Sequence, residues 1–444
     1  MIACRSVHGL SMLGFFASAL LGCAEAPATT AQTASARQTF DTAQIVKGAQ
    51  LSAIGDCRVC HTRESGRAFS GGRALPTPFG TVYSTNITPD ATTGIGHYTR
   101  DDFRRALHEG IDREGRHLYP AFPYDHFTHV SDDDIDALYA FIMTREAVTA
   151  RPPRNRLAFP ANVRPLLAAW NWLYLDDRRF AVDPNRSAEW NRGAYLVEGL
   201  AHCGACHTPR NVAGAEKKRA RFAGGEAEGW HAPGLLASSV APVEWTADAL
   251  YRYLREGFDA DHGLAAGPMA PVVDGLASVP EADVRAIVTY LTSLPRRERA
   301  APASDVVGAA AKREFDALAR HTPDRATEAG DGAAYAEDAG EIIFTGACAT
   351  CHFEGAGPPD PKPVPLALAT TVNATTPHDA LRIVVHGLHP EPGQAGAIMP
   401  GFGNALTHAQ IVAVVEYMRA RFSDRARWTD VSAVLHTIEQ ETEK

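Results

Sequence analysis

The chain has 444 residues, of which 45% are hydrophobic, and its 52 acidic residues outnumber its 43 lysines and arginines. The formal charge of −9 disfavours nucleic acid or another polyanion as a partner. The length is sufficient for about three domains of ordinary size.

The N-terminal residues predict export. Arg5 precedes an apolar run from Leu10 to Leu21, which is too short to cross a bilayer and is typical of a secretory signal. We therefore expect residues 1–22 to be a signal peptide and the mature protein to be periplasmic.

A cysteine follows this apolar run. The sequence Leu-Leu-Gly-Cys ending at Cys23 resembles a bacterial lipobox and predicts a lipid anchor at Cys23. The expected location is the periplasmic face of the cytoplasmic membrane. Cleavage after Ala26 is the alternative, and it would leave a soluble product. Residues 23–37, rich in Ala, Thr and Gln, predict a flexible tether.

Three copies of the pattern Cys-x-x-Cys-His recur at almost equal, domain-sized intervals, starting at Cys57, Cys203 and Cys348. Two thiols at this spacing can add to the two vinyl groups of one porphyrin, and the adjacent histidine can bind its iron. A thioredoxin-like redox pair does not need three copies each followed by His, and a four-cysteine zinc site needs pairs close in sequence. The pattern therefore predicts three covalently bound haem c groups.

Each residue of the motifs has a role in this prediction. The attachment residues are Cys57, Cys60, Cys203, Cys206, Cys348 and Cys351, and the proximal iron ligands are His61, His207 and His352. Only Cys4 and Cys23 of the eight cysteines lie outside the motifs, which argues against a disulfide framework.

Each motif also lies in the same local frame, between a glycine and an apolar helical pattern. The glycines are Gly48, Gly193 and Gly340, and the helical patterns cover residues 135–142, 284–291 and 411–418. A first and a last helix that cross with Gly against an aromatic residue are the arrangement of class I cytochrome c. The sequence therefore predicts a mainly α protein of three tandem class I cytochrome c domains.

The repeated frame also gives the expected boundaries. The domains are residues 38–147, 186–296 and 333–424, the linkers are 148–185 and 297–332, and the C-terminal tail is 425–444. The first linker contains Trp170 and Trp172, so we expect it to pack on the neighbouring domains. The turn-rich segment 76–96 is expected to cover the haem edge of the first domain.

Two methionines are predicted as sixth iron ligands by counting back from the last helices. Met269 and Met399 stand beside proline before the last helices of the second and third domains. We expect both to be loop residues that hold a thioether sulfur over the iron and raise its potential.

The first domain departs from this pattern, because the equivalent position is Phe122, which cannot ligate. Three histidines lie nearby: His117, His126 and His129. His126 is the favoured candidate, and an open sixth position is the alternative. A second histidine ligand would lower the potential of the first haem relative to the other two.

The three motifs, with residues 77–90 and 267–271, resemble the three-haem cytochrome c subunit of bacterial membrane-associated dehydrogenases, such as those for alcohols and gluconate. Those subunits carry Met where this chain has Phe122. The segment 119–128 is instead similar to cytochromes that partner molybdenum hydroxylases, such as nicotinate, isoquinoline or aldehyde dehydrogenases. The resemblance covers nearly all of the mature chain.

The resemblance implies an electron-transfer subunit that is not an enzyme by itself. Electrons are expected to come from a periplasmic dehydrogenase catalytic subunit, favoured as a molybdenum hydroxylase, with or without an iron-sulfur subunit. They would leave to quinone, another cytochrome or a terminal oxidase. One alternative is the cytochrome subunit of an alcohol or sugar dehydrogenase, and another is a haem enzyme or sensor that uses an open first haem.

Overall fold

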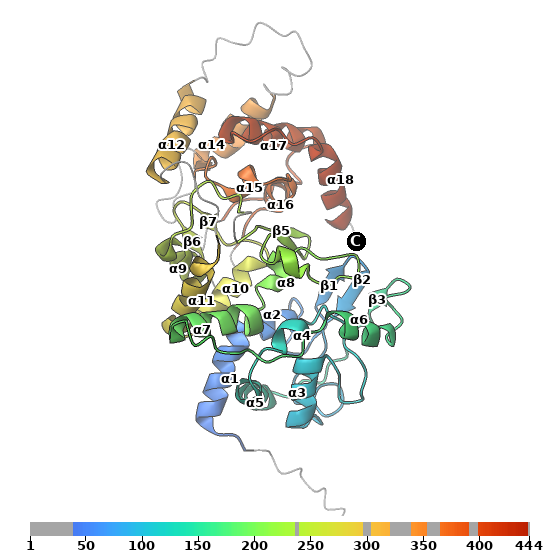
Figure 1. Cartoon of the computed structure of the whole chain (residues 1–444). Coiled ribbons are helices and arrows are strands. Elements are labelled where there is room, and N and C mark those ends of the chain that lie inside the picture. Colours follow the sequence, from blue (N-terminus) through green and yellow to red (C-terminus); the bar gives the residue numbers. More distant parts are fainter. Residues whose placement is uncertain are drawn as a thin grey trace, which may run out of the picture. The chain divides into compact units, whose positions relative to one another are not determined.

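The computed structural model describes residues 39–235, 239–295, 303–319, 339–352, 365–389 and 398–442. The expected signal peptide, the tether with Cys23 and much of the second linker lie outside these ranges. Phe40–Lys444 form one compact unit. This unit is mainly helical with a few short strands, as the sequence predicts (Figure 1). None of the described helices is both long and apolar enough to cross a membrane.

The first region contains the motif that starts at Cys57. Its elements are α1 (Thr42–Ile54), α2 (Cys57–Cys60), β1 (Ala74–Thr77), β2 (Gly80–Tyr83), α3 (Arg100–Glu109), α4 (Tyr124–Phe127) and α5 (Asp132–Met143). Ser131 caps α5 by accepting a hydrogen bond from the Asp134 amide at 3.3 Å. The connection to the second region contains β3 (Arg156–Leu157), which extends the antiparallel β1–β2 pair, and α6 (Leu166–Tyr174).

The second region contains the motif that starts at Cys203. Its helices are α7 (Ala188–Tyr195), the π-helical turn η1 (Leu196–Leu200), α8 (Gly204–His207), η2 (Lys218–Ala220), α9 (Ala247–Glu256), α10 (Met269–Ala277) and α11 (Glu281–Ser293). Two antiparallel pairs lie between them, β4 (Gly225–Ala227) with β5 (Trp230–Ala232), and β6 (Phe258–Asp259) with β7 (Gly263–Leu264).

The third region contains the motif that starts at Cys348. Its described elements are α12 (Ala303–Ala319), the π-helical turn η4 (Phe344–Cys348), α14 (Ala349–His352), α15 (Thr370–Asn373), α16 (His378–His386), α17 (His408–Phe422) and α18 (Val431–Thr442). Thr407 and Gln410 form a capping box that fixes the start of α17.

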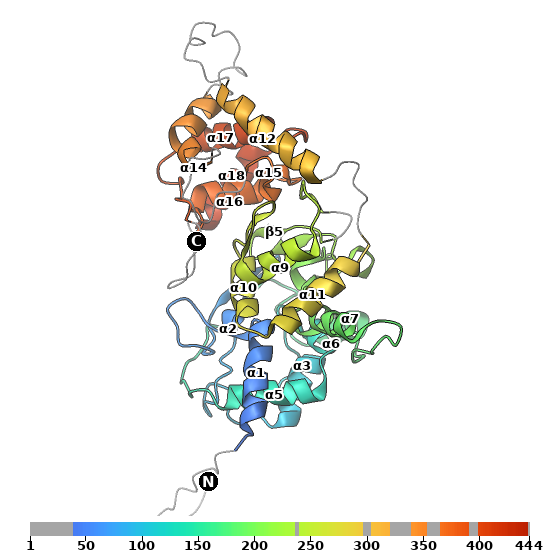
Figure 2. The same cartoon turned by 90° about the vertical axis from the view of Figure 1, so that its left-hand side faces the viewer.

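In all three regions a glycine allows two helices to cross in close contact. A Cβ atom added at Gly48 would lie 1.9 Å from the Ala137 oxygen, one at Gly193 would lie 1.8 Å from the Ala286 oxygen, and one at Gly340 would lie 2.4 Å from the Ala413 oxygen. The same added atoms would lie 2.7, 2.8 and 2.7 Å from the Cβ atoms of Phe141, Tyr290 and Tyr417. The expected contact of glycine with an aromatic residue is therefore present three times, and Figure 2 shows α1 crossing α5.

The three motif regions do not each have a separate hydrophobic core. Buried residues of the first and second regions, such as Leu51 and Ile287, belong to one continuous hydrophobic cluster. Buried residues of the third region, such as Phe344 and Val415, belong to a separate cluster. The first two regions therefore share a core.

The connection after α5 packs on its neighbours through one of its two tryptophans. The Trp170 ring contacts Tyr124, and its Nε1–H donates to the Ala213 oxygen at 3.0 Å. Trp172 is instead 83% exposed. The segment expected as a C-terminal tail contains α18, and Val431, Leu435 and Ile438 are buried in the third core.

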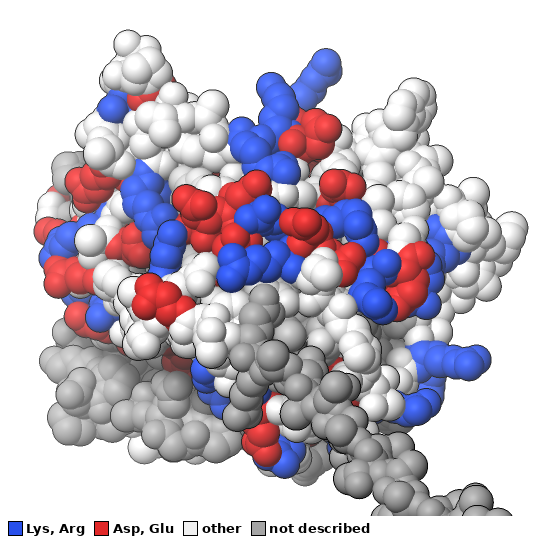
Figure 3. Space-filling view, turned by 90° about the horizontal axis from the view of Figure 1, so that it is seen from below, with Lys and Arg blue, Asp and Glu red and all other residues white. Residues whose placement is uncertain are grey.

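Charged side chains of both signs are interspersed on the face shown in Figure 3. Many form ion pairs between elements, such as Arg104 of α3, which donates to Asp136 of α5 at 2.6 and 2.9 Å. The Arg104 and Asp136 side chains are partly buried, and their ion pair joins α3 to α5.

Candidate haem-binding sites

The described cysteines of the motifs lie at short helices and form no disulfide among themselves. Burial raises the pKa of the Cys57, Cys206 and Cys348 thiols to about 11. It also raises the pKa of the Cys60 and Cys203 thiols to about 12. A reactive redox pair requires a thiolate and therefore a lowered pKa. The environment of these thiols disfavours that alternative.

Two proximal histidines are oriented for metal binding. The Nδ1–H of His61 donates to the Thr85 oxygen at 2.7 Å, and that of His207 donates to the Pro233 oxygen at 2.7 Å. A hydrogen bond from Nδ1 to a carbonyl fixes the tautomer and leaves the Nε2 lone pair for a metal. Burial lowers the pKa of both histidines, which favours the neutral form that binds iron.

The third proximal histidine differs from these two. The Nδ1 atom of His352 is buried without a hydrogen-bond partner among the residues that the structure describes.

Thr85 lies in the turn-rich segment 76–96, so this segment supports the proximal side of the first site. Sequence reasoning missed Thr85 and Pro233, because they contribute only backbone oxygens. The donor set at all three motifs fits a covalent haem with histidine on its iron.

The two predicted methionine ligands occupy different local structures. Met269 is the first residue of α10 rather than a loop residue, and it packs against the core shared by the first two regions. The chain leading to Met269 requires a glycine at position 267, because Gly267 has a φ of 55° and lies against the Trp230 ring. Met399 is a loop residue that pairs with Leu388 through two backbone hydrogen bonds of 2.9 Å and packs on the third core. Ligation by either methionine stays a prediction.

The first region has an aromatic cluster at the equivalent position. The Phe122 ring contacts Phe127, with centroids 5.3 Å apart. His117 pairs with Ile111 in a β-bridge, and its Nδ1 lies 3.3 Å from Asn171 Nδ2. These contacts do not identify a sixth ligand.

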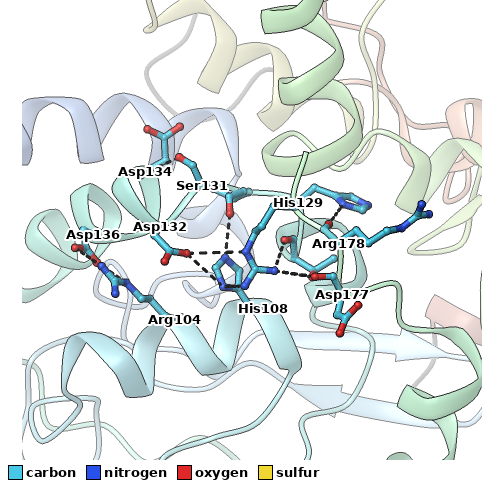
Figure 4. Close-up of polar contacts among 12 residues, drawn as sticks. Arg104, His108, His129, Ser131, Asp132, Asp134, Asp136, Asp177 and Arg178 are labelled. Carbon is cyan, nitrogen blue, oxygen red and sulfur yellow. Dashed lines mark hydrogen bonds and ion pairs between the residues drawn. The ribbon is translucent and has the colours of Figure 1, made fainter. Parts of the chain in front are cut away.

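His129 and a buried histidine that the sequence did not single out lie in the polar network of Figure 4. The Nδ1–H of His129 donates to the Arg178 oxygen at 2.7 Å, which leaves its Nε2 lone pair free of this bond. In His108, the Nε2–H donates to the Val130 oxygen at 3.0 Å, and Nδ1 accepts from Arg179 at 2.5 Å. His108 therefore has a structural role between α3 and the connection after α5.

Both ring nitrogens of His126 form hydrogen bonds with residues of the second region. Its Nδ1–H donates to the Glu198 oxygen at 2.9 Å, and its Nε2–H donates to Glu216 Oε1 at 2.7 Å. Both partners only accept, so both ring nitrogens carry protons and neither offers a lone pair to iron. This geometry disfavours His126 as the sixth ligand of the first haem, and the reason is a contact that no sequence spacing could reveal.

The first two motifs also lie against each other. His202, which precedes Cys203, places Nε2 3.4 Å from the oxygen of Gly55, two residues before Cys57. A Cβ atom on Gly55 would lie 3.0 Å from the Leu200 side chain. Neither the role of His202 nor this proximity was predicted from the sequence.

Comparison with known proteins identifies the class of the chain first. Residues 337–421 match the family model described as Cytochrome c. The chain is also 35% identical over 405 residues to the fructose dehydrogenase cytochrome subunit of Gluconobacter japonicus, covering 88% of this chain and 82% of that one. The chain therefore belongs to the family of cytochrome c subunits of dehydrogenases, which confirms the resemblance noted in the sequence.

Two further relatives differ in length. A nicotinate dehydrogenase subunit of Pseudomonas putida is 43% identical over 425 residues, which cover 95% of this chain but only 34% of that protein. A diheme cytochrome c-type protein of Cereibacter sphaeroides is 39% identical over 264 residues, covering 58% of this chain and 88% of that one.

Proposed function

We propose that the chain is a three-haem c-type cytochrome built from three tandem class I cytochrome c domains at residues 38–147, 186–296 and 333–424. The single observation that supports this most strongly is the threefold close contact of Gly48, Gly193 and Gly340 with a second helix, each ahead of a Cys-x-x-Cys-His motif. A haem at each motif supplies one-electron redox chemistry. The protein attaches it, provides the proximal histidine and limits its contact with water.

The proposed role is electron transfer from a dehydrogenase catalytic subunit to the respiratory chain. The similarity to the nicotinate dehydrogenase subunit of Pseudomonas putida favours a molybdenum hydroxylase as the electron donor, with or without an iron-sulfur subunit. Quinone, another cytochrome or a terminal oxidase would accept the electrons. The relatives named for fructose, gluconate and alcohol dehydrogenases support a sugar or alcohol dehydrogenase as the second candidate partner.

Purification of the cytochrome with its catalytic subunit tests this role. Anaerobic addition of nicotinate should reduce the haems, as read from their absorbance, whereas fructose and ethanol should not. A variant with both Cys203→Ala and Cys206→Ala should contain one haem fewer and transfer electrons more slowly. Reduction by fructose or ethanol instead would assign the second partner class, and the absence of reduction by all three substrates would exclude nicotinate, fructose and ethanol dehydrogenases as the donor.

A second candidate function is small-ligand binding at the first haem. Two observations favour it: Phe122 stands at the ligand position, and His126 is bound to Glu216 and to the Glu198 backbone. An iron with an open sixth position binds small molecules such as carbon monoxide.

We also propose that Cys23 anchors the mature protein to the periplasmic face of the cytoplasmic membrane. Cys23→Ser should release the cytochrome into the soluble periplasmic fraction, because two or more acyl chains are needed for firm attachment. Cys4→Ser is the matched control, since the expected signal peptide contains Cys4, and it should leave the distribution unchanged. Equal membrane retention of both variants would mean that a partner or a surface patch holds the protein.

A further inference from the structure

A largely buried ion pair joins the first region to the segment that follows the second motif. His126 of α4 is 8% exposed, and it donates to Glu216, which follows the second motif in the chain. Because both ring nitrogens donate to acceptors, the imidazole is positively charged. Glu216 therefore accepts a charge-assisted hydrogen bond, which is stronger than a neutral one.

The same pair lies directly against the second motif. A Cβ atom on Gly204, the first residue between Cys203 and Cys206, would lie 2.9 Å from His126 Cε1 and 3.1 Å from Glu216 Oε2. Arg210 holds the next residue of the motif by donating to the Ala205 oxygen at 2.9 Å. The backbone between the two cysteines is thus enclosed by charged side chains.

The surrounding groups keep His126 protonated and Glu216 ionised. Burial alone would lower the pKa of His126, but the hydrogen bond to Glu216 and the charge of Asp125 outweigh it and raise the pKa to about 9. Burial would raise the pKa of Glu216, yet His126 and Arg210 hold it below its usual value.

The carboxylates of Asp125 and Glu216 and the imidazole of His126 are close enough together to hold a metal ion. A protonated Nε2 has no lone pair for one, so an ion pair accounts for the contacts better than a metal site.

We propose that the His126–Glu216 pair positions the motif Cys203–His207 and sets the reduction potential of the haem held by His207. This inference rests on the proposed haem carriage. Charges act strongly on a nearby redox centre when water is excluded, and a negative charge favours the ferric state while a positive charge favours the ferrous state. Each member of the pair should therefore shift the potential in the opposite direction when it is neutralised.

Potentiometric titration of two variants tests the proposal. His126→Gln removes the positive member of the pair and should lower the potential of the second haem. Glu216→Gln removes the negative member and should raise it. The third region provides a matched control: His408→Gln breaks a more exposed pair, in which Nδ1 lies 3.1 Å from the Glu439 carboxylate, and should leave the second haem unchanged.

Intact mass is measured first on every protein, because it separates the two levels of the proposal. Fewer than three haems in the parent would contradict the proposed function itself. Three haems with shifts of the same sign in both variants, or with no shift at the second haem, would overturn the role of the pair alone. A shift confined to the first haem would mean that His126 acts on that iron instead.

Discussion

Met269→Leu should lower the midpoint potential of one haem and leave the other two unchanged. Leucine preserves most of the volume of the side chain but has no sulfur to bind iron, and a Met/His pair raises the potential of a cytochrome c haem. Axial ligands set haem potentials over a range of ~0.8 V, so the expected drop is on the order of 0.1 V or more. Met399→Leu should produce the same change at a different haem.

Met143→Leu is the matched control. Met143 ends α5 and packs partly buried against the core of the first two regions, without a place in the ligand frame. Its replacement should leave all three potentials unchanged, and intact mass should show three haems in every variant. Unchanged potentials in both the Met269 and Met399 variants would contradict the predicted ligands.

In the parent protein, one haem should differ in spectrum from the other two, and carbon monoxide binding to that haem alone would indicate an open sixth position.

The sequence was sufficient to predict the structural features that repeat along the chain. Gly48, Gly193 and Gly340 could be identified because each stands eight to ten residues before a motif, and each packs against a second helix as expected. A spacing that recurs in every region can predict contacts between residues of the same region. The same spacing led to the prediction of Met269 and Met399 as loop ligands, but Met269 begins a helix.

Contacts between regions could not be predicted in this way. His126 and Glu216 are 90 residues apart, and His202 and Gly55 are 147 residues apart. Their meeting depends on how the core shared by the first two regions packs, which leaves no periodic trace in the sequence. His126 was therefore interpreted as an iron ligand from its position near Phe122 alone, whereas the structure shows a salt bridge to the second region. The α18 helix was missed although Val431, Leu435 and Ile438 have helical spacing, because the segment was interpreted from its polar composition as a tail.

Gly340→Ala should destabilise the third region strongly. The added Cβ would lie 2.4 Å from the Ala413 oxygen and 2.7 Å from Tyr417 Cβ, and one of these contacts is with backbone that cannot rotate away. Forcing an extra carbon into a packed contact costs about 1–3 kcal/mol. The helix crossing at Gly340 should open, and the unfolding temperature of the third region should fall by several degrees.

Gly346→Ala provides the control in the same helical segment, because a Cβ atom at Gly346 would meet none of the described residues within 4 Å. Alanine is a better helix former than glycine by up to about 1 kcal/mol, so this variant should melt at the same temperature as the parent or slightly higher. Thermal unfolding followed by far-ultraviolet circular dichroism and by haem absorbance would measure both variants. An equal loss of stability in the two would contradict a specific role for the helix crossing at Gly340. A loss at Gly340 alone would show that the close helix crossing depends on the missing side chain.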